Sequence, residues 1–144
     1  MSDERPEPEA GSSLIGHRSS LAEGIALFND QKFWHAHEAW ERDWLVAAGE
    51  EKVFLQGLIQ LAAAYHHVQR GTFRGGVRLF DAALKKLASV PEGYAGVDRS
   101  DAVTQAAQHR EHIARNEHID AIAFPKLRYN SALHAPTESS RHRG

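Results

Sequence analysis

Residues 53–68 read VFLQGLIQLAAAYHHV, the stretch of this sequence that decides the fold. Apolar side chains fall on almost every side of a helical wheel drawn through it, which is the pattern of a helix buried all round. Gly71 follows directly after Arg70, and a glycine just beyond the last turn is a common helix stop. The stretch therefore predicts a central helix over residues 51–70, around which the other helices pack.

Four more helices are predicted around this central one. Ser20 and Glu23 have the spacing of a capping box, which predicts that the first helix begins at Ser20. Apolar periodicity predicts a second helix over residues 33–48, a fourth from Thr72 or Phe73 to just before Pro91, and a fifth that begins at Asp98 or Ser100. The sequence shows neither strand-like alternation nor a long repeat. The predicted fold class is all-α, a compact single-domain bundle of five helices.

Both ends of the chain differ in composition from this bundle. Residues 1–17 carry prolines and acidic residues with few apolar side chains, and they are predicted to be a disordered N-terminal tail. Residues 126–144 end in a polar sequence without helical periodicity, and they are predicted to be an irregular C-terminal tail. The helical domain is therefore expected to span residues 18–125.

The overall composition argues against several classes of function. The formal net charge is −2 and the pI is about 6.5, so the protein has no overall positive electrostatic field that would attract nucleic acid or an anionic membrane. The lack of cysteine excludes disulfides, thiolate metal sites and a cysteine nucleophile. The acidic first residues are untypical of a signal peptide, and no apolar run reaches the roughly 20 residues of a membrane span. We expect a cytoplasmic protein without nucleic-acid or membrane partners, and a small-molecule ligand and a homo-oligomer both stay open.

Residues 33–44, FWHAHEAWERDW, place polar side chains among all three tryptophans of the chain. On a helical wheel that advances about 100° per residue, His37 and Glu41 fall inside the apolar arc, with Glu38 at its margin. We therefore predict that His37 and Glu41 are largely buried, where a lack of partners would cost several kcal/mol. The side chains predicted to face away are His35, Ala39 and Arg42.

The central helix supplies partners for these inward polar groups. Its own inward polar side chains fall within about 40° of one another on the wheel. A short link at Gly49 makes the second and third helices antiparallel neighbours. The polar stripes of the two helices are thus expected to meet in one buried cluster, made by His37, Glu41, Gln56, Gln60 and His67.

One interpretation of this cluster is a metal site. Residues 37–41, HEAWE, follow the logic of the zincin helix, whose first and fifth positions bind the metal and whose second is a glutamate general base. His37 and Glu41 would be ligands, with Glu38 as the base. The third ligand would be His67, with His66 as its alternative, and an open position would hold a water of lowered pKa. Zinc or another divalent metal would serve, since a carboxylate ligand suits several metals.

The alternative interpretation is a structural hydrogen-bond network without a metal. His37 and Glu41 can bond to each other at their i, i+4 spacing, and the polar side chains of the central helix can satisfy the remaining groups. Tyr65 and the tryptophans are expected to be core residues. His109 and His112 are expected to lie on a solvated helix face, although their i, i+3 spacing could also bind a metal.

These segments together resemble domain of unknown function family 309, a family of small all-helical bacterial and archaeal proteins. The resemblance rests on LFNDQKFWHAHEAWERDW, FLQGLIQLAAAYHHVQRG and PEGYAGVD, and it covers residues 24–98. Where the family commonly has Gly-Asn and then Gly-Ala after its third helix, this chain has Gly71-Thr72 and Gly75-Gly76, so no role of that loop is carried over. The family's motif residues fall here on His37, Glu38, Glu41, Trp44, Gln56, Gly57, Gln60 and His66 or His67.

Some members of that family carry the label predicted metal-dependent hydrolase, so the resemblance implies metal-assisted hydrolysis as the enzymatic hypothesis. Glu38 would then be the catalytic base, next to the metal ligands named above. The side chains that would bind substrate or orient the ligands are Gln56, Gln60 and Trp44. The competing hypothesis is a non-catalytic binding or oligomerisation module, in which the cluster sets the register of the helices.

Overall fold

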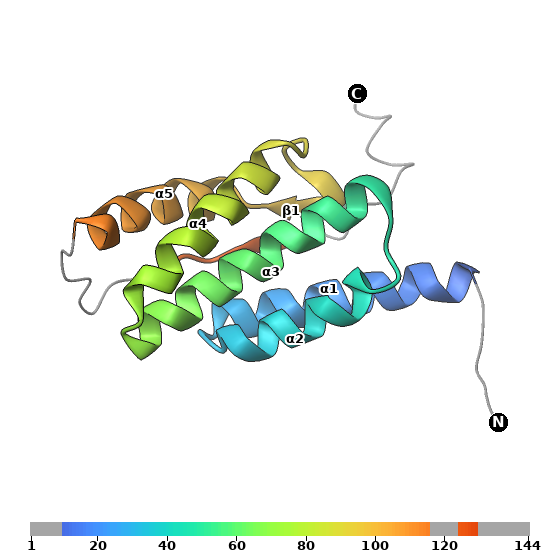
Figure 1. Cartoon of the computed structure of the whole chain (residues 1–144). Helices are drawn as coiled ribbons and strands as arrows, with labels where there is room; N and C mark the ends of the chain where they lie inside the picture. Colours follow the sequence, from blue (N-terminus) through green and yellow to red (C-terminus); the bar gives the residue numbers. More distant parts are fainter. Residues whose placement is uncertain (1–9, 116–123, 130–144) are drawn as a thin grey trace.

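Five helices and two very short strands make up the described part of the chain (Figure 1). The computed structural model describes residues 10–115 and 124–129. The helices are α1 (Ala10–Asn29), α2 (Phe33–Trp44), α3 (Gly49–Arg70), α4 (Phe73–Ala88) and α5 (Ser100–Ala114). A 3₁₀ turn, η1 (Tyr94–Gly96), leads into β1 (Val97–Asp98), which pairs with β2 (Arg128–Tyr129). The predicted all-α bundle is confirmed.

Helix α3 lies between α2 and α4, at the centre of the bundle (Figure 1). Its side chains Phe54, Leu58 and Tyr65 are at most 1% exposed, and burying one such side chain contributes roughly 1.5–3 kcal/mol. The helix ends as predicted, because Gly71 takes a left-handed conformation with a φ of 76°. Even so, none of the described helices, α3 included, is both long and apolar enough to cross a membrane.

Helix α1 begins earlier than the sequence predicted. The chain is helical from Ala10, so the predicted start at Ser20 is wrong, and Ser20 and Glu23 are interior positions of the helix. Residues 10–17, which the sequence assigned to a tail, belong to α1, and residues 1–9 lie outside the described part. A capping box is a local signal that does not by itself start a helix. Residues 10–19 contain no proline to interrupt the helix before Ser20, so α1 runs through the capping-box residues.

The contact between α1 and α2 is closely packed. Trp40 is fully buried, and its Nε1 donates a hydrogen bond to the backbone oxygen of Leu21, 3.2 Å away. The indole lies against Gly24, where an added Cβ would be 2.1 Å from Trp40 Nε1. A residue larger than glycine would therefore push the two helices apart. Arg42 and Glu23 add an exposed ion pair of 2.9 Å across the same interface.

Helix α2 ends at Trp44, before the predicted end at residue 48. The backbone N–H groups of residues 46 and 47 bond to carbonyls three residues back, so the chain tightens out of the α-helical conformation. Gly49, predicted as the stop of the second helix, is instead the first residue of α3, with a φ of 62°. The short link predicted between the two helices is therefore the turn over residues 45–48.

Helix α4 has the predicted bounds, and α5 has the predicted start. Helix α4 ends before Pro91, and α5 begins at Ser100, one of its two predicted starts. Asp98 Oδ1 accepts hydrogen bonds from the backbone N–H and the hydroxyl of Ser100, at 3.1 and 2.8 Å. A carboxylate here complements the positive end of the helix dipole.

Arg99 joins the end of α4 to the start of α5. Its residue is 2% exposed, and its guanidinium donates hydrogen bonds to the backbone oxygens of Leu87 (2.7 Å), Val90 and Pro91 (3.0 Å). The last carbonyls of a helix lack partners within the helix and carry the negative end of its dipole. This buried cation therefore binds the carbonyl of Leu87 in the last turn of α4 and the two carbonyls just beyond the helix, through three hydrogen bonds.

The chain returns to the bundle after α5. Leu127 is buried, and its backbone exchanges two hydrogen bonds of 2.8 Å with the side-chain amide of Asn29 at the end of α1. Residues 126–129, which the sequence assigned to an irregular tail, are thus docked on the bundle, and residues 130–144 lie outside the described part. A two-residue strand and one asparagine are too short a signal to be recognised as periodicity.

Candidate functional site

An open cleft of about 270 Å³ lies between α2, α3 and α4, and we call it the His37 cleft. Ile59, Ala63 and Leu79 form its apolar walls. The remaining side chains in its lining were all predicted as site residues, and they are His37, Glu41, Trp44, Gln56 and Gln60. The fold thus brings residues that are 23 positions apart in the sequence into the lining of one cleft, since His37 and Gln60 are both part of it.

Two buried polar atoms of these lining residues, His37 Nδ1 and Gln60 Oε1, have no hydrogen-bond partner among the described residues. About 90% or more of buried backbone polar groups, and most buried side-chain polar atoms, are paired. Each unpaired one costs about 1–3 kcal/mol. No hydrogen bond joins His37 to Glu41, or Gln60 to His67, in the described part of the chain. The network expected from the i, i+4 spacing is therefore not formed.

Trp34 packs against the His37 ring. The two rings stack with centroids 4.6 Å apart and planes 26° apart, and the indole also contacts the ring of His66 at 5.2 Å. Trp34 is 45% exposed, whereas the sequence placed it in the core. A stacked ring restricts the plane of an imidazole and hence the directions of its two nitrogens. Trp34 is thus a neighbour of the site that the sequence analysis did not assign to it, and it also contacts His66, the alternative third ligand.

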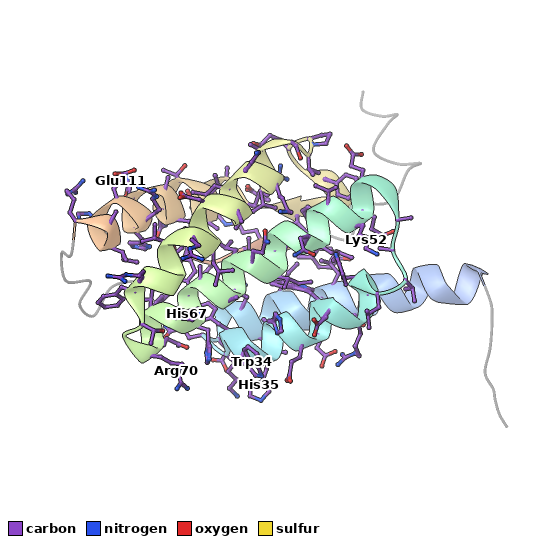
Figure 2. The ribbon with its side chains drawn as sticks, in the orientation of Figure 1. Trp34, His35, Lys52, His67, Arg70 and Glu111 are labelled. Carbon is purple, nitrogen blue, oxygen red and sulfur yellow. The ribbon has the colours of Figure 1, made fainter. Side chains whose placement is uncertain are left out.

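His67 does not line the His37 cleft. Its Nδ1 lies 2.6 Å from Thr72 Oγ1, at the turn into α4, and Figure 2 shows it near the C-terminal end of α3. His66 lies closer to the site, since its ring and that of His37 both pack on Trp34. Burial, followed by the charges of neighbouring basic side chains, lowers the pKa of His66.

The described residues contain no group of three or more His, Asp or Glu side chains placed to hold a metal ion. His37 and Glu41 line the cleft together, but Glu38, predicted as the base, is outside the lining. A catalytic zinc centre needs three protein ligands. The structure therefore does not bring His37, Glu41 and His67 together as a ligand set.

The exposure of α2 side chains corrects the predicted helical wheel. Glu41, predicted to be buried, is exposed, whereas His35 and Arg42 are exposed as predicted. Ala39, predicted to face away, is buried. The wheel assumed that α2 packs on α3 alone, but α1 covers its other side. The buried face of α2 consists of Phe33, Ala36, Ala39, Trp40 and Asp43.

A second polar pair, which the sequence analysis missed, joins α3 to α5. Tyr65 is fully buried, and its hydroxyl lies 2.7 Å from Nδ1 of His109. Burial raises the pKa of Tyr65, so its hydroxyl stays protonated and can donate a hydrogen bond to the imidazole. Burial, and then the charge of His112, lowers the pKa of His109, which favours the neutral ring as acceptor. His109 is half-buried, so its predicted place on a solvated face is wrong.

Comparisons with known proteins find relatives of this chain but name no activity. The model of the family described as "Domain of unknown function (DUF309)" matches residues 21–79, a range that includes every residue lining the His37 cleft. A protein of Aquifex aeolicus (strain VF5) named "Uncharacterized protein" is 28% identical over 111 residues, which are 76% of this chain and 32% of that protein. The chain thus spans about a third of the length of that curated relative.

One solved structure is similar in both sequence and fold. It is the crystal structure of a conserved hypothetical protein from Thermus thermophilus, which is 32% identical to this chain. The match covers 62% of this chain and 94% of that one, with a TM-score of 0.56. The identity and the coverage together make the two proteins members of one family.

Proposed function

This chain belongs to the family described as domain of unknown function 309, and we propose that it binds a small polar molecule in the His37 cleft. The observation that supports this function is the pair of buried, unpartnered atoms in one lining, His37 Nδ1 and Gln60 Oε1. A ligand N–H or O–H group would satisfy Gln60 Oε1, and a second polar group would satisfy His37 Nδ1. Binding would then recover the roughly 1–3 kcal/mol that each unpaired atom costs.

The lining also restricts the size and charge of the ligand. The volume of about 270 Å³ is just below the usual range of roughly 300–1,000 Å³ for ligand sites. Glu41 carries a negative charge in the lining. The positive charge of Lys52 lies nearby, with Nζ 4.4 Å from the ring centroid of Trp44, which also lines the cleft. These charges oppose each other, so we infer a small neutral ligand, such as an amide or an alcohol.

Metal-dependent hydrolysis is a second candidate, favoured by the position of His37 and Glu41 one helical turn apart in the same lining. An imidazole and a carboxylate at this spacing can both reach one divalent ion. They would be two protein ligands where a catalytic zinc centre needs three, and Glu38 lies outside the lining. The described residues therefore fit a metal centre incompletely, and no metal-dependent step is assigned to them.

Binding is tested by two-dimensional NMR of the full chain during titration with small amides and ureas. Each compound is paired with its fully N-alkylated analogue, which has no N–H donor for Gln60 Oε1. We expect the N–H compounds to shift the resonances of His37, Trp44 and Gln60, and the alkylated analogues to bind more weakly. Equal binding of the two analogues, or shifts that map elsewhere, would contradict the proposal.

Two matched variants make this test specific. Gln60→Leu removes the unpaired oxygen and should abolish the shifts, whereas Gln108→Leu makes the same chemical change at an exposed position on α5 and should leave them unchanged. Titration of the wild type and Glu41→Gln with Zn²⁺ tests the metal site that the second candidate requires. A saturable shift at His37 that Glu41→Gln removes would support that metal site, and its absence in the wild type would contradict the second candidate.

A further inference from the structure

A second open cleft, of about 410 Å³, lies between α4 and α5. It shares no lining residue with the His37 cleft, and we call it the Arg74–Arg78 cleft. Two guanidinium groups here stand beside apolar side chains, whereas the His37 cleft is lined by neutral and acidic polar groups. The residues that line the second cleft are Phe73, Arg74, Val77, Arg78, Ile113 and Ala114.

The two arginines of this cleft have no counter-ion among the described residues. Arg74 and Arg78 are exposed, lie one helical turn apart, and form no ion pair or hydrogen bond with a described side chain. Asp81 is the one acidic residue of α4, and both of its oxygens bind Arg110 of α5, at 2.7 and 3.0 Å. The carboxylate nearest in sequence is thus already paired, and within residues 10–115 and 124–129 no carboxylate balances the two positive charges at the rim of the cleft.

The walls of the cleft are apolar and belong to helices that are fixed to each other. Ile113 of α5 is 3% exposed, and Phe73 and Val77 of α4 are half-buried. The two-bonded ion pair between Asp81 and Arg110 joins the same two helices. Paired bonds of this kind fix orientation as well as distance. The arginines therefore stand beside an apolar surface that is present before any ligand binds.

We propose that the Arg74–Arg78 cleft binds a small organic anion, a carboxylate or a phosphate monoester that carries a short apolar group. A guanidinium presents parallel N–H donors that match either headgroup. The apolar group would cover Val77 and Ile113, and the volume of about 410 Å³ is within the roughly 300–1,000 Å³ usual for ligand sites. This site is separate from the one proposed above, and neither depends on the other.

The test uses four probes that separate charge from apolar surface. Hexanoate and hexyl phosphate carry both, 1-hexanol carries only the apolar chain, and inorganic phosphate carries only the charge. In NMR titrations of the full chain at low salt, both six-carbon anions should shift the methyl resonances of Val77 and Ile113. They should bind at least about tenfold more tightly than 1-hexanol, which lacks the charge-assisted hydrogen bonds, and than inorganic phosphate, which lacks the apolar chain. Their binding should weaken as salt is added. The tighter of the two anions identifies the headgroup.

Two double variants with the same loss of charge decide whether the arginines form the site. Arg74→Gln/Arg78→Gln should weaken hexanoate and hexyl phosphate by about tenfold, whereas Arg70→Gln/Lys85→Gln, at exposed positions outside the cleft, should change both by less than about twofold. Thermal midpoints should stay the same, since Arg74 and Arg78 make no described bond. Equal affinity for 1-hexanol, shifts away from the cleft, or equal weakening by both double variants would overturn the proposal.

Discussion

His37 and Trp40 lie one turn apart on α2, and each has a buried ring nitrogen. Nε1 of Trp40, on the side of α1, donates to the backbone oxygen of Leu21, whereas Nδ1 of His37, on the side of α3, has no described partner. The first side is packed to contact at Gly24, and the second leaves a cleft of about 270 Å³. Most buried polar atoms in proteins are paired, and the ligand proposed above would supply the partners that His37 Nδ1 and Gln60 Oε1 lack.

The close packing on the α1 side can be broken by one methyl group. Gly24→Ala should lower the free energy of unfolding by about 3 kcal/mol, because the new Cβ would lie 2.1 Å from the fully buried Trp40 ring. Gly76→Ala is the matched control in a helix, since the nearest atom to its added Cβ is 3.6 Å away. That variant should be neutral or up to about 1 kcal/mol more stable. Urea unfolding measures both, and equal effects would mean that α1 and α2 are not in close contact at Gly24.

Arg99 extends the comparison to a buried charged side chain that does have hydrogen-bond partners. Arg99→Met should lower the free energy of unfolding by about 2 kcal/mol, because the backbone oxygens of Leu87, Val90 and Pro91 lose their bonds to the guanidinium. Arg128→Met is the control, since Arg128 is exposed and lies 3.9 Å from Asp101. Its effect should stay below about 0.5 kcal/mol. A harmless Arg99→Met, measured by urea unfolding, would show that water replaces the guanidinium at this helix end.

The same comparison explains what could be predicted from the sequence. The bounds of α4 and the end of α3 depend on local signals, such as the left-handed Gly71 and the nearby Pro91, and they were predicted correctly. The inward face of α2 depends on which helices cover it, and its apolar side chains alone did not show that Ala39 is buried in a helix that also packs on α1. Glu41 was therefore placed in the interior, although it lies exposed in the lining of the cleft.

The polar residues that line the His37 cleft could be predicted from the sequence, whereas their geometry could not. Gln60 and His37 carry polar groups at inward positions of two neighbouring helices, and periodicity detects such positions. Trp34 and His37 lie three residues apart on α2, so helical spacing makes them neighbours, and the sequence analysis overlooked this signal. The bond between Tyr65 and His109 joins α3 to α5, and no spacing within one helix encodes it.

The Tyr65–His109 pair tests a neutral hydrogen bond in the satisfied core. Tyr65→Phe should lower the free energy of unfolding at pH 8 by about 1 kcal/mol, because the imidazole loses its partner while the ring packing is kept. Phe is the closest shape to Tyr, so no large cavity contributes. Tyr129→Phe, at a half-buried position on β2, is the control and should have a smaller effect. Equal effects of the two variants would mean that the bond to His109 contributes nothing.

This pair also determines how stability depends on pH. The pKa of His109 is lower in the folded protein than in the unfolded chain, so the unfolded chain binds more protons between the two values. Stability should therefore be complete above the ordinary histidine pKa of about 6.5 and decrease as pH falls below it. His66, whose pKa is also lowered, contributes with the same sign. His109→Gln should reduce the slope of the free energy of unfolding against pH, measured by urea unfolding between pH 8 and 5. An unchanged slope would mean that His109 does not contribute to this pH dependence.

The smallest expected effect on stability is at Gln60. This substitution tests most directly whether the cleft side of α2 differs from the closely packed α1 side. Gln60→Leu should leave the free energy of unfolding unchanged or raise it by up to about 1 kcal/mol, because it removes a buried oxygen without a partner and adds apolar surface near Ile59 and Leu79. A polar side chain that stabilised the fold would behave like Arg99, and its loss would be destabilising. Comparing the free energies of unfolding of Gln60→Leu and Gln108→Leu in urea therefore decides whether the Gln60 side chain stabilises the fold or serves to bind a ligand. Destabilisation by more than about 1 kcal/mol would show that its oxygen has a partner in solution, whereas a stable variant that no longer binds the amides would assign Gln60 to recognition.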